Sequence, residues 1–214
     1  RKHADRVDAI AAQIMLENFL PRADEPYEGF PPLARPDARA LVLGSMPSRE
    51  SLARRQYYAH PRNAFWPIMT RLFGLQASDY GKRAAELTAR GVAVWDVLHA
   101  CTRPGSLDSA IDDSSIVTND FAAFFTAHPD IRRVFFNGAK AESVYRRRVL
   151  PTLRGPAADL PLHRLPSTSP AHASLDLEGK ISAWRVLADD DATANTLNAL
   201  AWFSALAERR TEDV

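Results

Sequence analysis

The sequence predicts an α/β fold in three layers, with a central parallel sheet of four strands between two layers of helices. Four short apolar runs show no alternation with polar residues, which is typical of strands buried on both faces. Segments of helical length separate these runs, and strands that alternate with helices imply right-handed crossovers and helices on both faces of a parallel sheet. The runs are Ala40–Leu43, Val92–Trp95, Val134–Phe136 and, less cleanly, Leu160–Leu165.

Before the first strand, the sequence predicts a helix and an extended arm. Apolar residues at helical spacing among charged positions indicate an amphipathic helix over about residues 4–20, which Pro21 ends. The stretch that follows, up to residue 38, is rich in proline, which forbids regular structure and indicates an arm laid over the domain. The prolines of this arm are Pro21, Pro26, Pro31, Pro32 and Pro36.

After the fourth strand, the apolar pattern predicts closing helices over about residues 178–187 and 192–210. We interpret residues 190–214 as a C-terminal helical extension and residues 1–38 as the N-terminal helix and arm. The whole chain, residues 1–214, is expected to form a single domain, because it is too short for two ordinary ones.

Composition excludes several classes of protein. The chain carries 27 Lys and Arg against 26 Asp and Glu, so an anionic partner must be held by a local patch rather than by the field of the whole molecule. The single cysteine, Cys101, excludes an intramolecular disulfide framework and a four-cysteine zinc or iron–sulfur centre. The six histidines show no close metal-ligand spacing, so we expect no metal and no cofactor. No stretch approaches the roughly 20 apolar residues of a membrane span, so we expect a cytoplasmic protein without a membrane partner.

Polar side chains follow the ends of the predicted strands. Ligands of open parallel sheets bind beyond the carboxyl ends of the strands. We therefore expect Ser45, Met46, Asp96, Asn137 and Ser167 to converge on one rim. Asp96 has a competing interpretation as the N-cap of a following helix, which is the commoner role for a single aspartate at a strand end.

The most unusual segment lies directly after the first strand. It begins with Gly44-Ser45-Met46-Pro47-Ser48 and continues into a long turn, residues 56–66, that is rich in aromatic and amide side chains. Such exposed apolar area is unfavourable unless a flat ligand covers it, which favours a pocket for a ring. The alternative is that Tyr57, Tyr58, Phe65 and Trp66 only cover the sheet.

Two further segments could contribute chemistry. Asn63 could position a water molecule or a leaving group, although an Asx turn after Pro61 is the commoner fate of such a residue. Ser167-Thr168-Ser169-Pro170 follows the fourth strand and precedes Ala171-His172. Hydroxyl and backbone N–H groups near a predicted helix start would suit a phosphate clamp, and an ordinary helix cap explains half of them equally well.

Taken together, these motifs resemble the uracil-DNA glycosylase superfamily, and most closely its hypoxanthine-DNA glycosylase branch. The resemblance covers about residues 29–187; the long first motif is specific, whereas the later ones would be weak alone. It rests on Gly29-Phe30-Pro31-Pro32, Gly44-Ser45-Met46-Pro47-Ser48, Tyr57-Tyr58-Ala59-His60-Pro61-Arg62-Asn63-Ala64-Phe65-Trp66, Val94-Trp95-Asp96-Val97, Arg103-Pro104-Gly105-Ser106-Leu107-Asp108, Phe136-Asn137-Gly138 and Pro166-Ser167-Thr168-Ser169-Pro170-Ala171.

The resemblance implies a monofunctional DNA glycosylase. Such an enzyme flips a deaminated base, here hypoxanthine by preference, out of DNA and hydrolyses its N-glycosidic bond to leave an abasic site. The partner is then DNA that contains deaminated bases, and the enzyme would work as a monomer in the cytoplasm, at the nucleoid. The superfamily fold, a parallel four-stranded sheet between helices, agrees with the fold predicted from the strand pattern.

The resemblance also implies roles for individual residues. Met46 stands where the related mismatch-specific branch has an Asn, and by similarity to the hypoxanthine branch the catalytic role falls to Asn63. Tyr58 falls at the position whose ring stacks on the flipped base. The residues expected to bind the base are Ser45, Met46, Pro47, Tyr58, Phe65, Asp96 and Asn137, and those expected to contact the DNA backbone are Ser48, Ser167, Thr168, Ser169 and His172.

Base selection is expected to depend on hydrogen bonds along one edge of the base. The Asn137 amide could donate to a carbonyl and accept from a ring N–H, a pattern that hypoxanthine and uracil share and adenine reverses. Three alternatives remain open: a uracil-preferring glycosylase, against which Met46 speaks; a binding module that does not cleave, against which Asn63 speaks; and an unrelated nucleotide-binding α/β protein.

Overall fold

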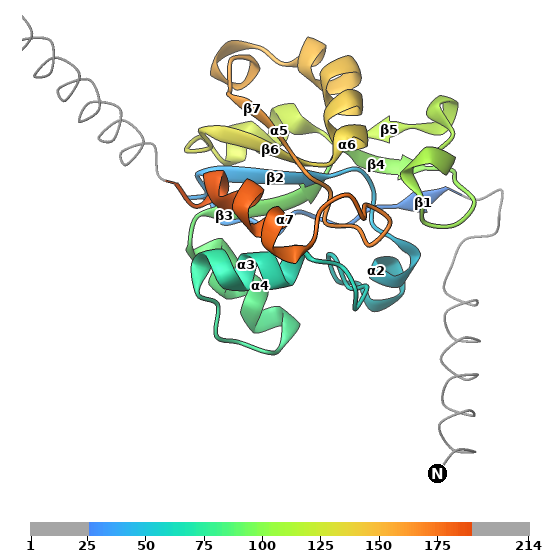
Figure 1. Ribbon diagram of the computed structural model, residues 1–214. Helices are drawn as coiled ribbons and strands as arrows, with labels where there is room; N and C mark the ends of the chain where they lie inside the picture. The colour runs from blue at the N-terminus through green and yellow to red at the C-terminus, as the bar shows by residue number, and fades with distance from the viewer. Residues whose placement is uncertain (1–25, 190–214) are drawn as a thin grey trace, which may run out of the picture.

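Four parallel strands form the central sheet of the computed structural model, which describes residues 26–189 (Figure 1). Their order across the sheet is β3 (Val92–Asp96), β2 (Ala40–Gly44), β6 (Arg133–Asn137) and β7 (Leu162–Leu165). All four predicted strands are present and parallel, and the last one begins at Leu162 rather than at residue 160. The predicted helices at residues 4–20 and 192–210 lie outside the described residues.

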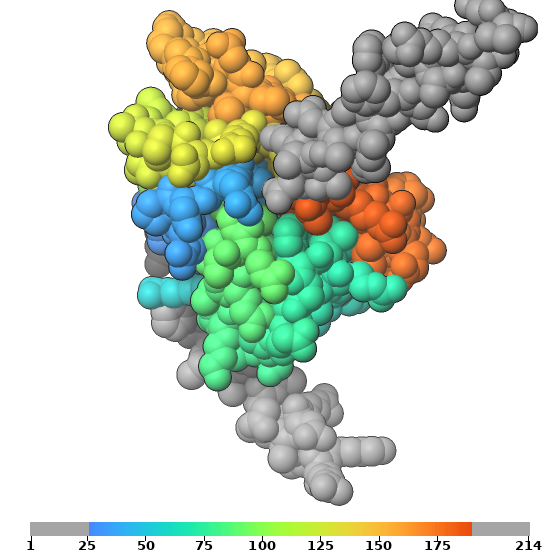
Figure 2. All heavy atoms as spheres, turned by 90° about the vertical axis from the view of Figure 1, so that its left-hand side faces the viewer, coloured from blue at the N-terminus to red at the C-terminus, as the bar shows by residue number. Residues whose placement is uncertain are grey.

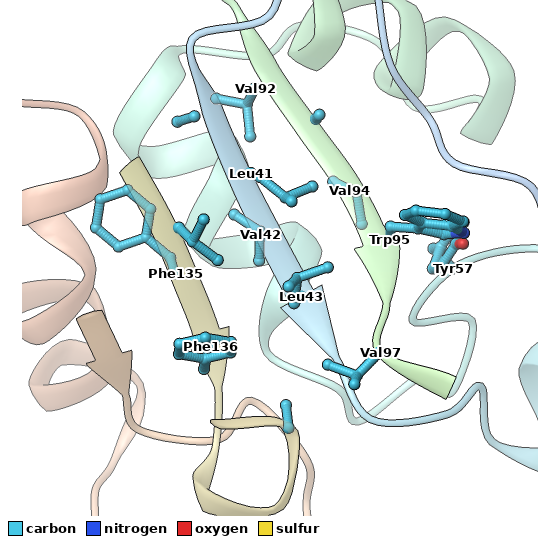
Figure 3. Close-up of a cluster of buried hydrophobic side chains, with 14 of the residues drawn as sticks. Leu41, Val42, Leu43, Tyr57, Val92, Val94, Trp95, Val97, Phe135 and Phe136 are labelled. Carbon is cyan, nitrogen blue, oxygen red and sulfur yellow. The ribbon is translucent and has the colours of Figure 1, made fainter. Parts of the chain in front are cut away.

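Strands β2 and β3 are continuous apolar runs because both of their faces are covered. Every residue of β2 and β3 is buried, and Leu41 pairs with Ala93 on one side and with Val134 on the other. Figure 3 shows the side chains of these strands and of Phe135 and Phe136 from β6 in one cluster. At the edge of the sheet, β7 buries only Leu165, which explains why its apolar pattern is the least regular.

Helices cover both faces of the sheet, as the alternation of strands and helices predicts (Figure 1). On one face lie α3 (Phe65–Phe73), α4 (Tyr80–Ala89) and α7 (Leu177–Trp184), and on the other lie α5 (Phe121–Ala127) and α6 (Ala139–Val144). A short helix, α2 (Arg49–Arg54), follows β2. Short 3₁₀ turns span Asp108–Ala110, Asp113–Ser115, Leu150–Thr152, Gly155–Ala158 and Arg185–Leu187, and a π-helical turn spans Tyr145–Val149.

Three of the helices begin at an aspartate cap. The side chains of Asp79, Asp120 and Asp176 accept hydrogen bonds from backbone N–H groups in the first turns of α4, α5 and α7, at 2.8–3.0 Å. Such caps stabilise a helix by about 1 kcal/mol each. The predicted helix over residues 178–187 corresponds to α7 and the 3₁₀ turn that follows it.

A second, antiparallel sheet lies beside the carboxyl end of β3, and the sequence pattern did not predict it. It consists of β1 (Tyr27–Glu28), β4 (Leu98–Cys101) and β5 (Val117–Thr118), in the order β1-β4-β5. Two of these strands are only two residues long and carry no periodic signal. Since β4 begins two residues after β3 ends, Asp96 precedes a strand, and its interpretation as a helix cap is wrong.

The proline-rich segment passes along the β3 edge of the sheet as an extended chain. Leu33 forms an antiparallel bridge with Val94, and the backbone carbonyl of Phe30 accepts hydrogen bonds from Trp95 Nε1 at 3.0 Å and Tyr57 Oη at 3.4 Å. Figure 3 shows Trp95 and Tyr57 side by side at this edge of the cluster. Backbone carbonyls of the arm therefore satisfy two ring donors that would otherwise be buried without partners.

The amino and carboxyl ends of the strands face opposite sides of the molecule. Figure 2 shows the side where the strands begin: the blue segment that leads into β2 lies between the green segment before β3 and the yellow-green segment before β6. The predicted polar rim lies at the other end of the sheet, on the right of Figure 1.

Candidate active site

A cavity of about 320 Å³ opens beyond the carboxyl ends of β2 and β6. All the predicted site residues except Phe65 and Asp96 line it, so the structure brings segments from residue 45 to residue 172 together. The lining residues are Ser45, Met46, Pro47, Ser48, Ser51, Tyr57, Tyr58, Asn63, Ser106, Leu107, Asp108, Ser109, Asn137, Ser167, Thr168, Ser169, Ala171 and His172.

The wall that follows β2 is fixed by a buried arginine and an aspartate. Ser45 donates its hydroxyl proton to Asp108 Oδ1 at 2.5 Å, and Arg103 donates to the backbone carbonyl of Pro47. The Arg103 side chain is fully buried, with Nη1 4.0 Å from Asp108 Oδ1, and its guanidinium lies over the ring of Tyr27. The loop from Arg103 to Asp108 thus holds the Ser45–Pro47 segment in place.

Asp96 lies beneath this wall rather than in it. It is only 3% exposed, and its Oδ2 has no hydrogen-bond partner among residues 26–189. Burial, assisted by the negative charge of Asp108 and opposed by Arg103, raises the pKa of Asp96 to about 8. Its Oδ1 lies so close to the Gly44 Cα that a Cβ at position 44 would overlap it, which accounts for the glycine at the end of β2.

Two tyrosines of the long turn line the cavity: the buried Tyr57 and the half-buried Tyr58. The backbone of Tyr58 is in the left-handed region, with φ of 55°, which is rare for a bulky residue and typical of functional positions. Its ring stacks on Phe65 at a centroid distance of 4.0 Å. Phe65 is fully buried behind it, so Phe65 supports the Tyr58 ring and does not reach the cavity.

Asn63 forms the Asx turn that its sequence context favours, and it also lies at the cavity. Its Oδ1 accepts a hydrogen bond from Phe65 N at 2.9 Å, which is the Asx turn that starts α3. The same side chain lines the cavity. A carbonyl oxygen has two lone pairs, so Oδ1 retains capacity for a second hydrogen bond from a ligand or water.

Asn137 and Thr168 form a buried pair that joins β6 to the loop after β7. Asn137 Nδ2 donates to Thr168 Oγ1, and Thr168 N donates to Asn137 Oδ1, both at 2.8 Å. These bonds fix the orientation of the amide and use one of its two N–H groups, and the Tyr58 hydroxyl lies near the same side chain. Thr168 is 1% exposed and also accepts from Ala64 N, so it connects the loop to α3 beneath the surface that DNA could reach.

The loop after β7 is not the start of a helix, contrary to the prediction. Residues 166–172 carry turns, and α7 begins only at Leu177 after its cap, Asp176. The Ser167 and Ser169 hydroxyls accept from backbone N–H groups two residues further on. Lys180 on α7 is 5% exposed and donates through Nζ to the carbonyls of His172 at 2.8 Å and Ser169 at 3.5 Å.

On the opposite side of the cavity, Ser48 has a structural role as well. Its side chain accepts a hydrogen bond from Ser51 N at 3.2 Å and caps α2.

The close approach of the loop after β7 to β6 depends on a glycine. Gly138 has a φ of 99°, and a Cβ at this position would come within 3.1 Å of Ser167 Cβ, so only glycine allows this approach.

Sequence reasoning missed the contribution of the segment Ser106–Ser109. Asp108 and the exposed Leu107 line the cavity, and Ser106 Oγ accepts from Arg49 N at 3.0 Å. The signal was present in the motif Arg103–Asp108, but no local pattern places this loop against Ser45, which lies 63 residues away in sequence.

Within residues 26–189, no group of three or more His, Cys, Asp or Glu side chains could hold a metal ion. None of the helices in that range is long and apolar enough to cross a membrane. The cavity therefore offers amide, hydroxyl, carboxylate and aromatic groups as its chemistry.

Comparison with known proteins gives concordant matches. A family model described as the uracil DNA glycosylase superfamily matches residues 31–190. A hypoxanthine DNA glycosylase from Methanosarcina acetivorans is 37% identical over 137 residues, which make up 59% of this chain and 85% of that protein. A hypoxanthine DNA glycosylase from Methanosarcina barkeri is 36% identical over 116 residues, or 53% of this chain and 72% of that protein.

A solved structure shares the fold. A solution NMR structure of a Methanosarcina acetivorans protein, described as a candidate uracil DNA glycosylase, superposes with a TM-score of 0.62 at 33% sequence identity. The match covers 77% of this chain and 100% of that one.

Proposed function

The chain belongs to the uracil DNA glycosylase superfamily, and on that basis we propose that it removes deaminated bases, hypoxanthine by preference, from DNA. The base is flipped out of the duplex, and hydrolysis of its N-glycosidic bond leaves an abasic site. The two curated relatives named as hypoxanthine DNA glycosylases support the choice of base.

The observation that carries this proposal is the composition of the cavity. The tyrosine rings of the long turn line a small space whose other walls offer hydrogen-bond donors and acceptors: Ser45, Asn63, Asp108 and Asn137. A flipped base needs a surface for stacking and polar groups along its edge. Tyr58 is well supported for stacking, since Phe65 holds it from behind.

We assign the catalytic role to Asn63. Cleavage of the glycosidic bond leaves positive charge on the sugar, so the enzyme must position a water molecule for attack on C1′ and stabilise the departing base. The second lone pair of Asn63 Oδ1 can accept a hydrogen bond from that water, while the hydrogen bond from Phe65 N keeps the oxygen fixed. The water oxygen forms the new C1′–O bond, the base leaves with the electron pair of the broken C1′–N bond, and the proton that the water loses ends on the departed base through solvent.

Hydrolysis is favoured over a lyase reaction, which requires an amine that attacks C1′. Among residues 26–189, no lysine lines the cavity, and the ammonium of nearby Lys180 is held by the carbonyls of His172 and Ser169. We assign contacts with the DNA backbone around the flipped nucleotide to four residues that line the cavity: Ser48, Ser167, Ser169 and His172. We also propose that the protein acts as a monomer in the cytoplasm, without a metal.

The test is a strand-cleavage assay in which alkali opens abasic sites, run in EDTA. Matched oligonucleotides carry hypoxanthine, uracil, xanthine or thymine opposite each normal base. We expect cleavage at hypoxanthine at the highest rate. Cleavage at uracil alone would make uracil the substrate. If no strand is cleaved and the protein shifts hypoxanthine DNA in a gel, the protein binds damaged DNA without cleaving it.

A further inference from the structure

The Ser45 hydroxyl lies in the cavity wall, and its proton already forms a hydrogen bond with Asp108. Ser45 Oγ is 2.5 Å from Asp108 Oδ1, and an ionised carboxylate only accepts hydrogen bonds. Arg103 Nη1 lies 4.0 Å from the same carboxylate oxygen. The hydroxyl proton is thus directed at Asp108, away from any ligand.

This arrangement changes what Ser45 can offer to a ligand. A free hydroxyl rotates and serves as donor or acceptor as the ligand requires. A hydroxyl whose proton is held by a carboxylate presents lone pairs only. Ser45 and Asp108 both line the cavity, and Ser45 is buried, so water does not readily replace a missing partner there.

We propose that Asp108 selects hypoxanthine over adenine by holding Ser45 as an obligate hydrogen-bond acceptor toward the flipped base. The proposal rests on the proposed glycosylase function. Hypoxanthine presents a ring N1–H donor beside the O6 acceptor, whereas adenine presents the N1 acceptor beside the N6 donor. An acceptor-only Ser45 satisfies N1–H and opposes the lone pair on adenine N1.

Asn137 supplies the complementary group. Its amide is held by Thr168 through one N–H and one oxygen lone pair, so its orientation is fixed, and the second N–H, which lies near the Tyr58 hydroxyl, can donate to O6. Fixed groups of this kind discriminate well, because a mismatched base leaves buried polar atoms unpaired. Asp108 acts through Ser45 and is therefore a positioning residue for base selection.

The test compares affinities for uncleavable DNA. Oligonucleotides carry 2′-fluoro-deoxyinosine or 2′-fluoro-deoxyadenosine opposite an abasic analogue, so that neither base has a partner to lose. In wild-type protein, hypoxanthine is expected to bind more tightly. In Asp108→Ala, the hydroxyl is free to turn toward adenine N1, and the preference should shrink by roughly tenfold or more, the scale of one buried polar group left unpaired.

Three further variants make the result specific. Asp108→Asn retains an oxygen that can accept the Ser45 proton and should keep most of the preference. Ser45→Ala should lose the preference, and adding Asp108→Ala to it should cause no further loss, because the two residues act as one unit. Asp113→Ala removes a carboxylate that pairs with Lys140, away from the cavity, and should leave the preference unchanged.

The outcomes separate the two levels of the proposal. Wild-type protein that never cleaves hypoxanthine DNA would remove the proposed function itself. If it cleaves, and the folded Asp108→Ala protein keeps the wild-type preference, Asp108 does not select the base. Loss of preference in Asp108→Ala but not in Ser45→Ala would mean that Asp108 contacts the base directly, which also overturns the role given to Ser45.

Discussion

At the scale of single residues, several side chains of the cavity serve the fold and the site at once. Asn63 starts α3 and faces the cavity, Ser48 caps α2, and Thr168 ties the loop after β7 to β6 and α3. A polar side chain fixed by the backbone loses little entropy when it meets a ligand, so such double use holds the site ready for binding. It also means that the loss of any one of these residues affects both stability and activity, and each test must separate the two.

Replacing Asn63 separates its two roles. Asn63→Ala should lower the single-turnover rate of base excision by roughly tenfold or more, because an oriented group in a fixed site stabilises the transition state by a few kcal/mol. DNA affinity should change little. Asn63→Asp keeps an oxygen for Phe65 N and for water and should lose less activity.

The matched control is Asp79→Ala, which removes the side-chain cap of α4 at a position outside the cavity. It should lower the free energy of unfolding by about 1 kcal/mol and leave excision unchanged. Asn63→Ala protein that excises hypoxanthine at the wild-type rate would reduce Asn63 to a helix cap.

Asp96 predicts a dependence of stability on pH. Its pKa is raised to about 8 in the folded protein, mainly by burial, so the folded state holds the proton more tightly than the unfolded chain does. The stabilisation that comes from this tighter proton binding is therefore complete below the unfolded pKa near 4. It is lost as the pH rises toward and through 8. Asp96→Asn removes this loss, and the variant should gain stability relative to wild type between pH 5 and pH 9.

Urea unfolding at pH 5, 7 and 9 measures this difference. Asp113→Asn is the control: the ion pair with Lys140 lowers the pKa of Asp113, so that carboxyl is ionised in folded and unfolded chains across the range and adds no slope. Parallel curves for wild type and Asp96→Asn would show that the Asp96 carboxyl titrates as in the unfolded chain.

At the scale of elements, α7 acts on the loop that closes the cavity. Lys180 is buried and has no acidic partner among the described residues, and burial lowers its pKa. Its ammonium instead holds the carbonyls of Ser169 and His172. A buried cation without an anion is unfavourable in the free protein, and a DNA phosphate at this loop would compensate it.

Lys180→Met keeps the apolar stem and removes the charge and both hydrogen bonds. We expect the dissociation constant for hypoxanthine DNA to rise by about three- to tenfold, the scale of one or two charged hydrogen bonds, with a smaller fall in the rate of the bound complex. Fluorescence anisotropy and single-turnover rates give the two values. Lys82→Met on α4, outside the cavity, is the control. A fall in thermal stability with an unchanged dissociation constant would leave Lys180 a purely structural residue.

At the scale of the whole molecule, residues 26–189 contain the sheet, helices on both of its faces and the cavity-lining side chains described above. The family match ends at residue 190, close to the same boundary. The core cluster extends from Tyr27 to Leu187, so the arm before β2 contributes to it directly. We propose that the chain is one domain whose catalytic capacity resides in this part.

A chain trimmed to residues 26–189 tests that proposal. It should unfold in a single transition and excise hypoxanthine within about threefold of the full rate under single-turnover conditions, because a domain with its own core folds by itself. A further trim to residue 36 is the comparison: it removes Tyr27 and the bond partners of Tyr57 and Trp95 and should destabilise the fold. A folded 26–189 protein without activity would assign part of the site to the ends of the chain.

The sequence by itself determined the four parallel strands, the helices on both faces and the rim where the site forms. Those features follow from local patterns: strands buried on both faces are continuously apolar, and the carboxyl ends of parallel strands share one edge. Most of the cavity lining could be predicted for this reason, together with the motifs that follow the strands.

Only the tertiary structure decided which of those residues reach the cavity. Phe65 and Tyr58 are similar aromatic residues in one motif, yet one supports the other from within the core. Asp96 lies beneath the wall, and Asp108 takes its place beside Ser45 through a contact between residues 63 positions apart. The short strands of the antiparallel sheet carry no periodicity of their own and exist because β4 pairs with both of its neighbours. Such contacts depend on how distant segments pack, and a local pattern in the sequence carries no information about them.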